Sequence, residues 1–383
     1  MIMIEKNCQG IYSSAAYRPL REPVSRWRVT ELSQDDITKR VKEIWEALLH
    51  DPEYGFTLQT VEDEACFFDT GNNDVRTEGQ SYGMLLAVLL DDKVFFDNVW
   101  RWTLRHMYLT EGPCRGYFAW SVPLDGREKA QGPAPDGEVF FCLALILAHQ
   151  RWGSGVGESD YARWAQKILR DMLHRDTDEA QPMIQDNDLI AFVPGLPFTD
   201  PSYILPHAFE LFADYCDEKD QLRWRRIAER GRKFLFDHAH PETGLYPEYA
   251  LNDGSPEPTR GHSDFYSDAY RCIINLAVDA ISCGFHEEAS RIGRLQAEFF
   301  FNRDPVERWL EFTVDGEPTG RDSLHPVGLQ ASLACCSVLS DDVASAHWEK
   351  NFAELPLRTG DRRYYDNLLY FFSYLVLSGW YTV

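Results

Sequence analysis

The sequence predicts an all-α fold, an (α/α)6 barrel in which six inner helices form a ring inside six outer helices. About twelve segments show helical periodicity, and two kinds of segment alternate along the chain. One kind has an apolar stripe on one side and charged residues on the other, as in a helix at a protein surface. The other kind is apolar nearly all round, as in a helix that is buried on every side. Strand-like runs are few and short, so the helices are expected to form the core.

The segments with a charged face are expected to form the outer layer. In segment 219–237 the apolar residues Leu222, Ile227 and Phe234 are separated by charged residues such as Arg226. Such a helix buries one face and exposes the other. In chain order these segments are 34–49, 93–108, 159–174, 219–237, 286–301 and 342–352.

The segments without a charged face are expected to form the inner ring. Segment 139–148 reads Val-Phe-Phe-Cys-Leu-Ala-Leu-Ile-Leu-Ala, and segment 272–281 is similar. In chain order the inner segments are 78–90, 139–148, 203–215, 272–281, 325–339 and 364–378. No composition break separates two halves, so we expect a single domain over residues 1–383, with a short N-terminal extension at about residues 1–30.

Charge and cysteine usage exclude several classes of partner. The formal net charge is -23, which disfavours binding to nucleic acid or to an anionic membrane, since both need Lys and Arg. A neutral ligand such as a sugar is compatible with this charge. The nine cysteines have irregular spacings without a CxxC pair, which favours reduced thiols over a disulfide framework or a zinc site.

The chain carries no signal for secretion or for membrane insertion. Its first residues lack the apolar run of a signal peptide, and no stretch approaches the roughly 18 apolar residues of a membrane span. We therefore expect a cytoplasmic protein. The sequence gives no sign of a metal site, so no metal and no other cofactor are expected. The sequence does not indicate an oligomeric state.

The starts of the inner helices are the expected location of a functional site, because parallel inner helices bring their N-terminal ends to one face of the ring. Five of these starts read Thr77-Glu78-Gly79-Gln80-Ser81-Tyr82, Ala134-Pro135-Asp136-Gly137-Glu138, Asp200-Pro201-Ser202-Tyr203, Tyr266-Ser267-Asp268-Ala269-Tyr270-Arg271 and Leu324-His325-Pro326. Helix capping is one explanation of these acids, and Asp136 and Asp268 suit it. Capping does not explain the adjacent glycines, the tyrosines, or Arg271 within one turn of Asp268. Acids with polar and aromatic neighbours are typical of a glycosidase site.

Glycoside hydrolysis requires two carboxyl groups in different protonation states. One must be protonated to donate to the leaving oxygen, and the other must be ionised to activate water or to attack the sugar. The helix dipole favours the ionised form, so the acid needs burial or nearby carboxylates to retain its proton. Glu78, with an apolar helix behind it and Asp136 as a neighbour, is the candidate for the acid.

Four motifs in chain order resemble glycoside hydrolase family 8. The segment Glu78 to Met84 resembles the general-acid segment of that family, and Asp268-Ala269-Tyr270-Arg271 is similar to its Asp-Ala-x-Arg base segment. Pro201-Ser202-Tyr203 also matches. Residues 134–138 resemble the signature Ala-Ser/Thr-Asp-Gly/Ala-Asp, with Pro135 and Glu138 as departures. The motifs extend over about 190 residues.

The resemblance implies an (α/α)6 fold and hydrolysis with inversion. It implies that Glu78 is the general acid and that Asp268 is the general base that activates water. Asp136 would hold the distorted sugar ring and bias the pKa values of its neighbours. An inverting pair of carboxyl groups is about 6.5–9.5 Å apart, which leaves room for the water.

The resemblance also implies substrate contacts. Tyr203 would orient the water with the base, and Arg271 would pair with a carboxylate. From its place at the first inner-helix start, Tyr82 is a further candidate for substrate binding. Trp120 precedes an inner helix and is a candidate for stacking on a sugar, although most of the eleven tryptophans are expected in the core.

Within the family, the Pro-Asp-Gly-Glu variant and Leu324-His325-Pro326 are most similar to members that release xylose from the reducing end of β-1,4-xylo-oligosaccharides. In those members the Leu-His-Pro loop blocks the cleft beyond the first leaving-group sugar, and the histidine contacts that sugar. Carried over, His325 would bind the reducing-end xylose. The other explanation of His325 is a helix-start residue before a proline at the first helical position. Imported xylo-oligosaccharides are the expected substrate.

Three alternatives remain open at the level of sequence. The first is an endo-acting β-1,4-glycanase of the same family, whether xylanase, glucanase or chitosanase, which would have an open cleft. The second is an (α/α)6 sugar epimerase, which would use histidines for proton transfer. The third is a carbohydrate-binding or structural protein, which buried unpaired acids at helix starts disfavour.

Overall fold

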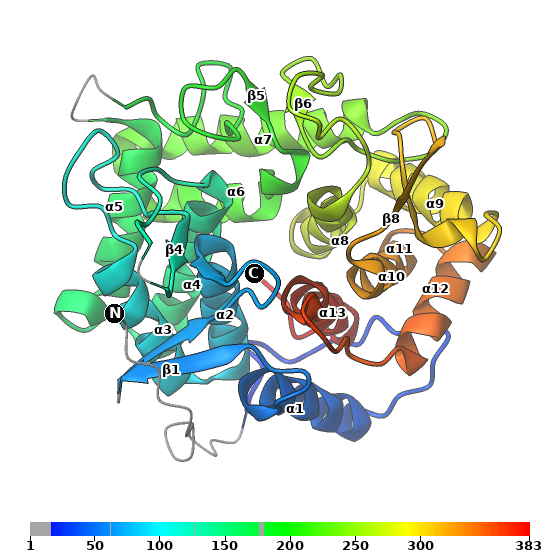
Figure 1. Ribbon diagram of the computed structural model, residues 1–383, viewed down its shortest axis with the longest axis horizontal. Coiled ribbons are helices and arrows are strands. Elements are labelled where there is room, and N and C mark those ends of the chain that lie inside the picture. The colour runs from blue at the N-terminus through cyan, green and yellow to red at the C-terminus, as the bar shows by residue number, and fades with distance from the viewer. Residues whose placement is uncertain (1–16, 62, 126, 176–179) are drawn as a thin grey trace.

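The protein folds into two concentric layers of helices (Figure 1). The computed structural model describes residues 17–61, 63–125, 127–175 and 180–383. The outer helices are α1 (Gln34–His50), α3 (Lys93–His106), α5 (Tyr161–Leu173), α7 (Gln221–His238), α9 (Glu287–Phe301) and α12 (Val343–Glu354). The inner helices are α2 (Thr77–Leu90), α4 (Pro135–Trp152), α6 (Pro206–Tyr215), α8 (Arg271–Cys283), α10 (Pro326–Ala334), its continuation α11 (Cys336–Leu339) and α13 (Arg363–Ser378). The prediction of an (α/α)6 barrel is confirmed.

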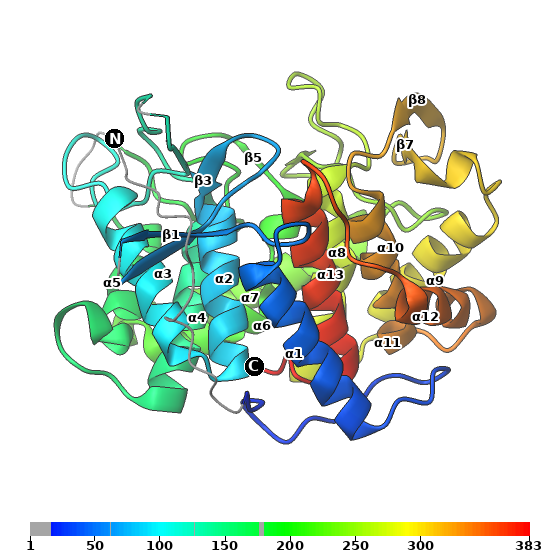
Figure 2. The same cartoon turned by 60° about the horizontal axis from the view of Figure 1, so that its bottom comes forward.

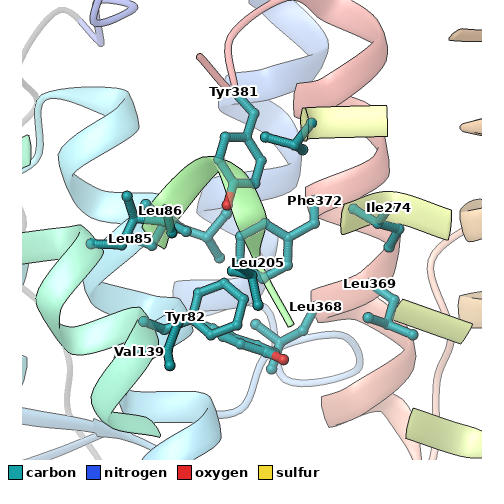
Figure 3. Packing of buried hydrophobic residues seen from close by; sticks show 14 of the residues in the cluster. Tyr82, Leu85, Leu86, Val139, Leu205, Ile274, Leu368, Leu369, Phe372 and Tyr381 are labelled. Carbon is teal, nitrogen blue, oxygen red and sulfur yellow. The ribbon is translucent and has the colours of Figure 1, made fainter. Parts of the chain in front are cut away.

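The inner helices form a closed ring. Each one contacts the next in the order α2, α4, α6, α8, α10 and α13, and α13 returns to contact α2. Apolar side chains from several of these helices meet inside the ring, among them Tyr82, Val139, Ile274 and Phe372 (Figure 3). The rings of Tyr82 and Phe372 pack edge-on with centroids 4.9 Å apart. This burial on all sides explains why the inner segments lack a charged face.

Two of the predicted inner segments differ from the observed helices. The segment expected at 203–215 begins as a helix only at Pro206, because the residue before a proline is disfavoured in the helical conformation. The segment expected at 325–339 divides at Cys335 into α10 and α11. There the Cys335 N–H donates to the carbonyl of Ser332, three residues back, which tightens the turn.

In the part of the chain that the structure describes, the strands form four two-stranded antiparallel sheets. They are β1 (Thr57–Val61) with β2 (Glu64–Phe67), β3 (Asp74–Arg76) with β4 (Ser121–Pro123), β5 (Phe198–Thr199) with β6 (Ala250–Leu251), and β7 (Leu310–Phe312) with β8 (Pro318–Asp322). Short 3-10 helices are η1 (Gly157–Ser159), η2 (Pro201–Tyr203), η3 (Glu218–Asp220), η4 (Ser267–Tyr270) and η5 (Glu307–Trp309). Figure 2 shows β3, β5, β7 and β8 at one end of the barrel, while the C-terminus lies at the other end. Because β3 runs directly into α2, that end carries the starts of the inner helices.

The predicted N-terminal extension lies only partly within the described residues, since residues 1–16 fall outside them. The part that is described contacts α12 and the last turn of α13. The backbone N–H groups of Arg28 and Val29 donate to Oε1 of Glu349 at 2.8 and 2.7 Å, and the Arg26 N–H donates to the carbonyl of Leu377 at 2.6 Å. Within the described ranges, no helix has the length and apolar character needed to cross a bilayer.

Candidate active site

A cavity of about 510 Å³ lies where the starts of the inner helices meet. This volume is within the range of small-molecule sites, about 300–1,000 Å³. Six of the predicted site residues line it: Glu78, Trp120, Asp136, Tyr203, Asp268 and His325. The other two, Tyr82 and Arg271, are not among the lining residues and are 1% and 3% exposed. They lie behind the carboxylates.

The guanidinium of Arg271 connects the acids of four helix starts. Its Nη1 donates to Glu78 Oε2 at 3.3 Å, to Asp136 Oδ2 at 3.1 Å and to the Tyr82 hydroxyl at 2.6 Å. Its Nη2 lies 3.3 Å from Asp268 Oδ1 and 3.6 Å from Asp200 Oδ2. A single positive charge therefore faces four carboxyl groups. Since buried like charges raise each other's pKa, not all four can be ionised together.

Glu78 lies in an environment that favours a retained proton. Burial raises its pKa to about 8, Arg271 acts in the opposite direction, and Asp268 and Asp136 raise it further. Burial likewise raises the pKa of Asp136 to about 6, and Arg271 again opposes the shift. With a pKa of about 8, the carboxyl group of Glu78 is mostly protonated near neutral pH and can act as a general acid.

The Asp268 carboxylate is positioned by two groups from other parts of the chain. The Tyr365 hydroxyl, from the first turn of α13, donates to Asp268 Oδ1 at 3.1 Å and to the Ser267 carbonyl at 3.3 Å. The Asp268 N–H donates to Glu248 Oε1 at 3.2 Å, and Glu248 Oε2 lies 2.5 Å from Nδ1 of His262. Ser267 has a φ of 31°, a left-handed conformation that is costly outside glycine. These contacts hold the backbone of Ser267 in that conformation and position Asp268.

The two acids that form the predicted pair share one cavity and one cation. Glu78 Oε2 and Asp268 Oδ1 each lie 3.3 Å from a terminal nitrogen of Arg271. The two terminal nitrogens of a planar guanidinium are about 2.3 Å apart, so these oxygens are at most about 9 Å apart. Inverting glycosidases separate their carboxyl groups by about 6.5–9.5 Å, and the bound is compatible with that geometry.

Capping does not account for the acids at these starts. The N-cap positions of α2, α4 and η4 are Arg76, Ala134 and Tyr266, and none of them has a side-chain capping hydrogen bond. The suggestion that Asp136 and Asp268 serve as N-caps is therefore wrong, because both fall inside the first turn. Their side chains turn to Arg271 instead. Asp200 is a true N-cap and accepts from the Ser202 N–H at 2.8 Å.

Trp120 lies on the rim of the cavity. It is 41% exposed, and the guanidinium of Arg76 lies 5.4 Å from its ring centroid. The backbone of the Trp120 loop is fixed from both sides, because the Thr77 N–H donates to the Trp120 carbonyl at 3.0 Å and the Phe118 N–H donates to Glu138 Oε1 at 3.0 Å. An exposed ring on a fixed loop is suited to stacking on a sugar.

Several residues of the site were not predicted from the sequence. Tyr364 and Tyr365 line the cavity from the sixth inner-helix start, and the six-fold pattern of starts could have identified them. Asp200 precedes a motif that was recognised. Glu248 and His262 come from the long loop between α7 and η4, where no local pattern distinguishes them.

Comparison with known proteins identifies close relatives. The family model described as glycosyl hydrolases family 8 matches residues 60–302. A reducing end xylose-releasing exo-oligoxylanase from Halalkalibacterium halodurans is 44% identical and covers 98% of this chain and 96% of that protein. One from Paenibacillus barcinonensis is 43% identical and covers 98% of both.

Solved structures of such proteins are also similar to this chain. A reducing-end xylose-releasing exo-oligoxylanase complexed with xylose matches with a TM-score of 0.89 and 44% identity, covering 91% of this chain and 94% of that one. A mutant complexed with xylobiose matches equally well, with a TM-score of 0.89, 44% identity and the same coverage of 91% and 94%. Endoglucanase 2 from Ruminiclostridium josui is more distant, at 24% identity over 80% of this chain and 64% of that protein.

Proposed function

The chain belongs to glycosyl hydrolases family 8, and we propose that it releases xylose from the reducing end of β-1,4-xylo-oligosaccharides with inversion. The observation that carries this proposal is the pair formed by Glu78 and Asp268, which line one cavity on either side of the Arg271 guanidinium. Glu78 has the raised pKa of a general acid. Both residues match the family's motifs in the sequence.

The proposed reaction uses both carboxyl groups in one step. Glu78 donates its proton to the glycosidic oxygen as the bond from that oxygen to the anomeric carbon breaks. Asp268 accepts a proton from a water that attacks the anomeric carbon from the opposite face, with Tyr203 orienting the water. The β-linkage becomes an α-configured hydroxyl. Glu78 leaves the step ionised and Asp268 protonated, and proton exchange with solvent restores both.

Asp136 and Arg271 support this reaction without exchanging protons with the substrate. Asp136 lines the same cavity as Glu78. Its proposed role is to hold the distorted sugar ring. Arg271 is buried behind it and restrains the carboxylates. The face of the Tyr203 ring lies 5.6 Å from that guanidinium, which places the phenol in the same network.

The choice of exo over endo action is supported by the relatives. Those that are 42–44% identical over most of the chain are reducing-end exo-oligoxylanases, whereas Endoglucanase 2 from Ruminiclostridium josui is 24% identical. His325 lines the cavity at the start of α10, the position assigned to the reducing-end xylose.

We also infer that residues 1–383 form one catalytic domain and that the enzyme acts in the cytoplasm on imported oligosaccharides. The contacts of α13 with α2 support the first statement, because they close the ring between its first and last inner helices. The eight cysteines in the described ranges are free thiols, which suits a reducing compartment.

Xylotriose labelled with ¹³C at its reducing-end anomeric carbon tests the proposal. Purified enzyme should release labelled xylose and unlabelled xylobiose, as followed by mass spectrometry. Label in xylobiose would contradict release from the reducing end, and absence of cleavage would contradict the substrate class. Cellotriose and chitosan trimers are the matched comparisons and should remain intact.

A further inference from the structure

The carboxyl group of Asp366, in the first turn of α13, is fully buried and uses both of its oxygens. Oδ1 accepts the backbone N–H of Gly328 at 2.7 Å. Oδ2 lies 3.0 Å from Nδ1 of His325 and also accepts from the Arg358 guanidinium. Because a backbone N–H and a guanidinium can only donate, both oxygens of Asp366 act as acceptors.

This arrangement determines which nitrogen of His325 carries hydrogen. Because a carboxylate only accepts, Nδ1 of His325 must be the donor to Asp366. In a neutral imidazole the other nitrogen, Nε2, then has a free lone pair. His325 lines the cavity, and its Nε2 has no hydrogen-bond partner among the residues that the structure describes. The histidine therefore presents a hydrogen-bond acceptor to the cavity.

The imidazole is also held in place. Arg358 Nη1 donates to the Leu324 carbonyl at 2.6 Å, which fixes the backbone immediately before the histidine. The ring of Tyr365 packs edge-on against the imidazole with centroids 4.7 Å apart. The same Tyr365 donates to the Asp268 carboxylate. One helical turn thus positions both the proposed base and His325.

We propose that Asp366 is a positioning residue for substrate specificity: it holds His325 with hydrogen on Nδ1, so that Nε2 accepts a hydrogen bond from a hydroxyl of the reducing-end sugar. This inference rests on the proposed function, which places that sugar against His325. Because Nε2 of His325 is an acceptor, the site favours a sugar hydroxyl, which can donate a hydrogen bond, over a substituent that can only accept one.

Replacing Asp366 by asparagine reverses the tautomer without removing the side chain. The backbone N–H of Gly328 is fixed and buried and still requires an acceptor, whereas the Arg358 side chain is 25% exposed and can turn to solvent. The amide oxygen therefore takes the place of Oδ1, and the amide NH₂ faces His325. Nδ1 must then accept, and the hydrogen moves to Nε2. In the Ser-His-Asp triad the same substitution preserves the geometry and enforces the wrong tautomer.

The kinetic test uses xylotriose analogues whose reducing-end hydroxyls are replaced one at a time, by fluorine at positions 2 and 3 or by a methyl ether at position 1. These groups accept hydrogen bonds but do not donate them. The wild-type enzyme should lose about 10-fold or more in kcat/KM on the analogue that replaces the contacted hydroxyl. In the Asp366→Asn variant, the kcat/KM on xylotriose and the kcat/KM on that analogue should become nearly equal. Adding Asp366→Asn to the His325→Ala variant should cause no further loss of kcat/KM on xylotriose, because Asp366 acts through His325.

Asp279→Asn is the matched control. Asp279 is a buried aspartate on another inner helix and pairs through both oxygens with Arg232, at 2.8 and 2.9 Å. Its substitution removes the same charge from the same kind of buried arginine pair, away from the cavity. It should lower thermal stability and leave the ratio between xylotriose and the analogues unchanged.

A second measurement addresses the tautomer directly, even if the Asp366→Asn variant does not fold. ¹⁵N NMR of the histidine-labelled wild-type enzyme, with His325 assigned by its absence in His325→Ala, should show hydrogen on Nδ1 and none on Nε2 at pH 7.5. Hydrogen on Nε2, or an unchanged analogue ratio in a folded Asp366→Asn variant, would overturn the inference. Failure of the wild-type enzyme to cleave xylotriose would instead contradict the proposed function, and the NMR result would still decide the tautomer.

Discussion

Glu78 and Asp268 contact different terminal nitrogens of the same arginine, each at 3.3 Å. They come from the starts of the first and fourth inner helices and line the same cavity. Arg271 thereby restrains both carboxyl groups while the space above it remains open to substrate. The same guanidinium also faces Asp136 and Asp200. Because its single positive charge cannot neutralise four carboxylates, Glu78 retains a proton.

Removing the proposed acid or base should abolish turnover without unfolding the protein. We expect Glu78→Gln and Asp268→Asn each to lower kcat on xylotriose by about 10²–10⁴-fold, the usual contribution of general acid-base catalysis. The circular dichroism spectrum should be unchanged, and xylobiose binding should persist by calorimetry. Activity within a few-fold of wild type in either variant would remove that residue from the mechanism.

The pH dependence of kcat/KM should have an alkaline limb near pH 8. Glu78 has a pKa raised to about 8, mainly by burial, so it carries the proton it must donate below that pH and loses it above. Activity therefore falls as pH rises through about 8, and kcat/KM reports this pKa for the free enzyme. Initial rates on xylotriose between pH 4 and 10 measure it. A rate that stays constant up to pH 10 would show that the acid is a different group.

Thermal stability should depend on Glu78 in the direction set by the same shift. The folded protein binds this proton more tightly than the unfolded chain, since the pKa rises from 4.5 to about 8 on folding. The associated stability is present in full below pH 4.5 and is lost as pH rises through 8. Glu78→Gln cannot ionise, so its unfolding temperature should exceed that of wild type by a few degrees at pH 8.5 and match it at pH 4. Calorimetry at the two pH values measures these unfolding temperatures. If the variant and the wild type differed by the same amount at both pH values, burial of Glu78 would not be the cause of the shift.

Tyr365 should affect turnover more than substrate binding. Its hydroxyl donates to Asp268 Oδ1 and to the Ser267 carbonyl, so Tyr365→Phe frees the base segment in its left-handed conformation. We expect kcat to fall about 5- to 50-fold, in keeping with one lost hydrogen bond to a charged group, with KM changed less than two-fold. Tyr364→Phe is the comparison. Among the described contacts, the hydroxyl of Tyr364 does not contact Asp268. A change confined to KM would assign Tyr365 to substrate binding.

Gly79 should tolerate no side chain. A Cβ at this position would overlap the hydroxyl and ring of Tyr364, so Gly79→Ala must displace α13 or the start of α2, where Glu78 lies. We expect a loss of about 1–3 kcal/mol in the free energy of unfolding, as for other overpacked sites, together with a loss of activity. Gly132→Ala is the control, because its Cβ would be 3.7 Å from Cys114 Sγ, an ordinary contact. Equal stability of the two variants by urea denaturation would contradict this packing.

The sequence was sufficient to predict the barrel because each layer has its own pattern. All-round apolar segments such as α4 and one-sided segments such as α7 alternate without exception, and this alternation reflects burial on two sides or on one. The acids of the first, second and fourth inner-helix starts were found because their motifs are local in the chain. Their convergence followed from the parallel direction of the inner helices.

The remaining features of the site depend on contacts between distant segments. Glu248 reaches the Asp268 backbone from a loop whose path follows from no local periodicity, and Asp366 contacts His325 only because α10 and α13 are neighbours in the ring. The alternative explanation of Asp136 and Asp268 as N-cap residues was wrong for a related reason. A favoured N-cap residue type does not determine the cap when a buried arginine competes for its side chain.

The configuration of the first product tests the central claim most directly. A ¹H NMR time course of xylotriose hydrolysis should show the α-anomer of xylobiose before mutarotation produces the β-anomer, because water activated by Asp268 attacks the face opposite the leaving sugar that Glu78 protonates. Initial appearance of the β-anomer would mean retention through a covalent intermediate, and it would contradict the assignment of Glu78 and Asp268 as an inverting acid and base.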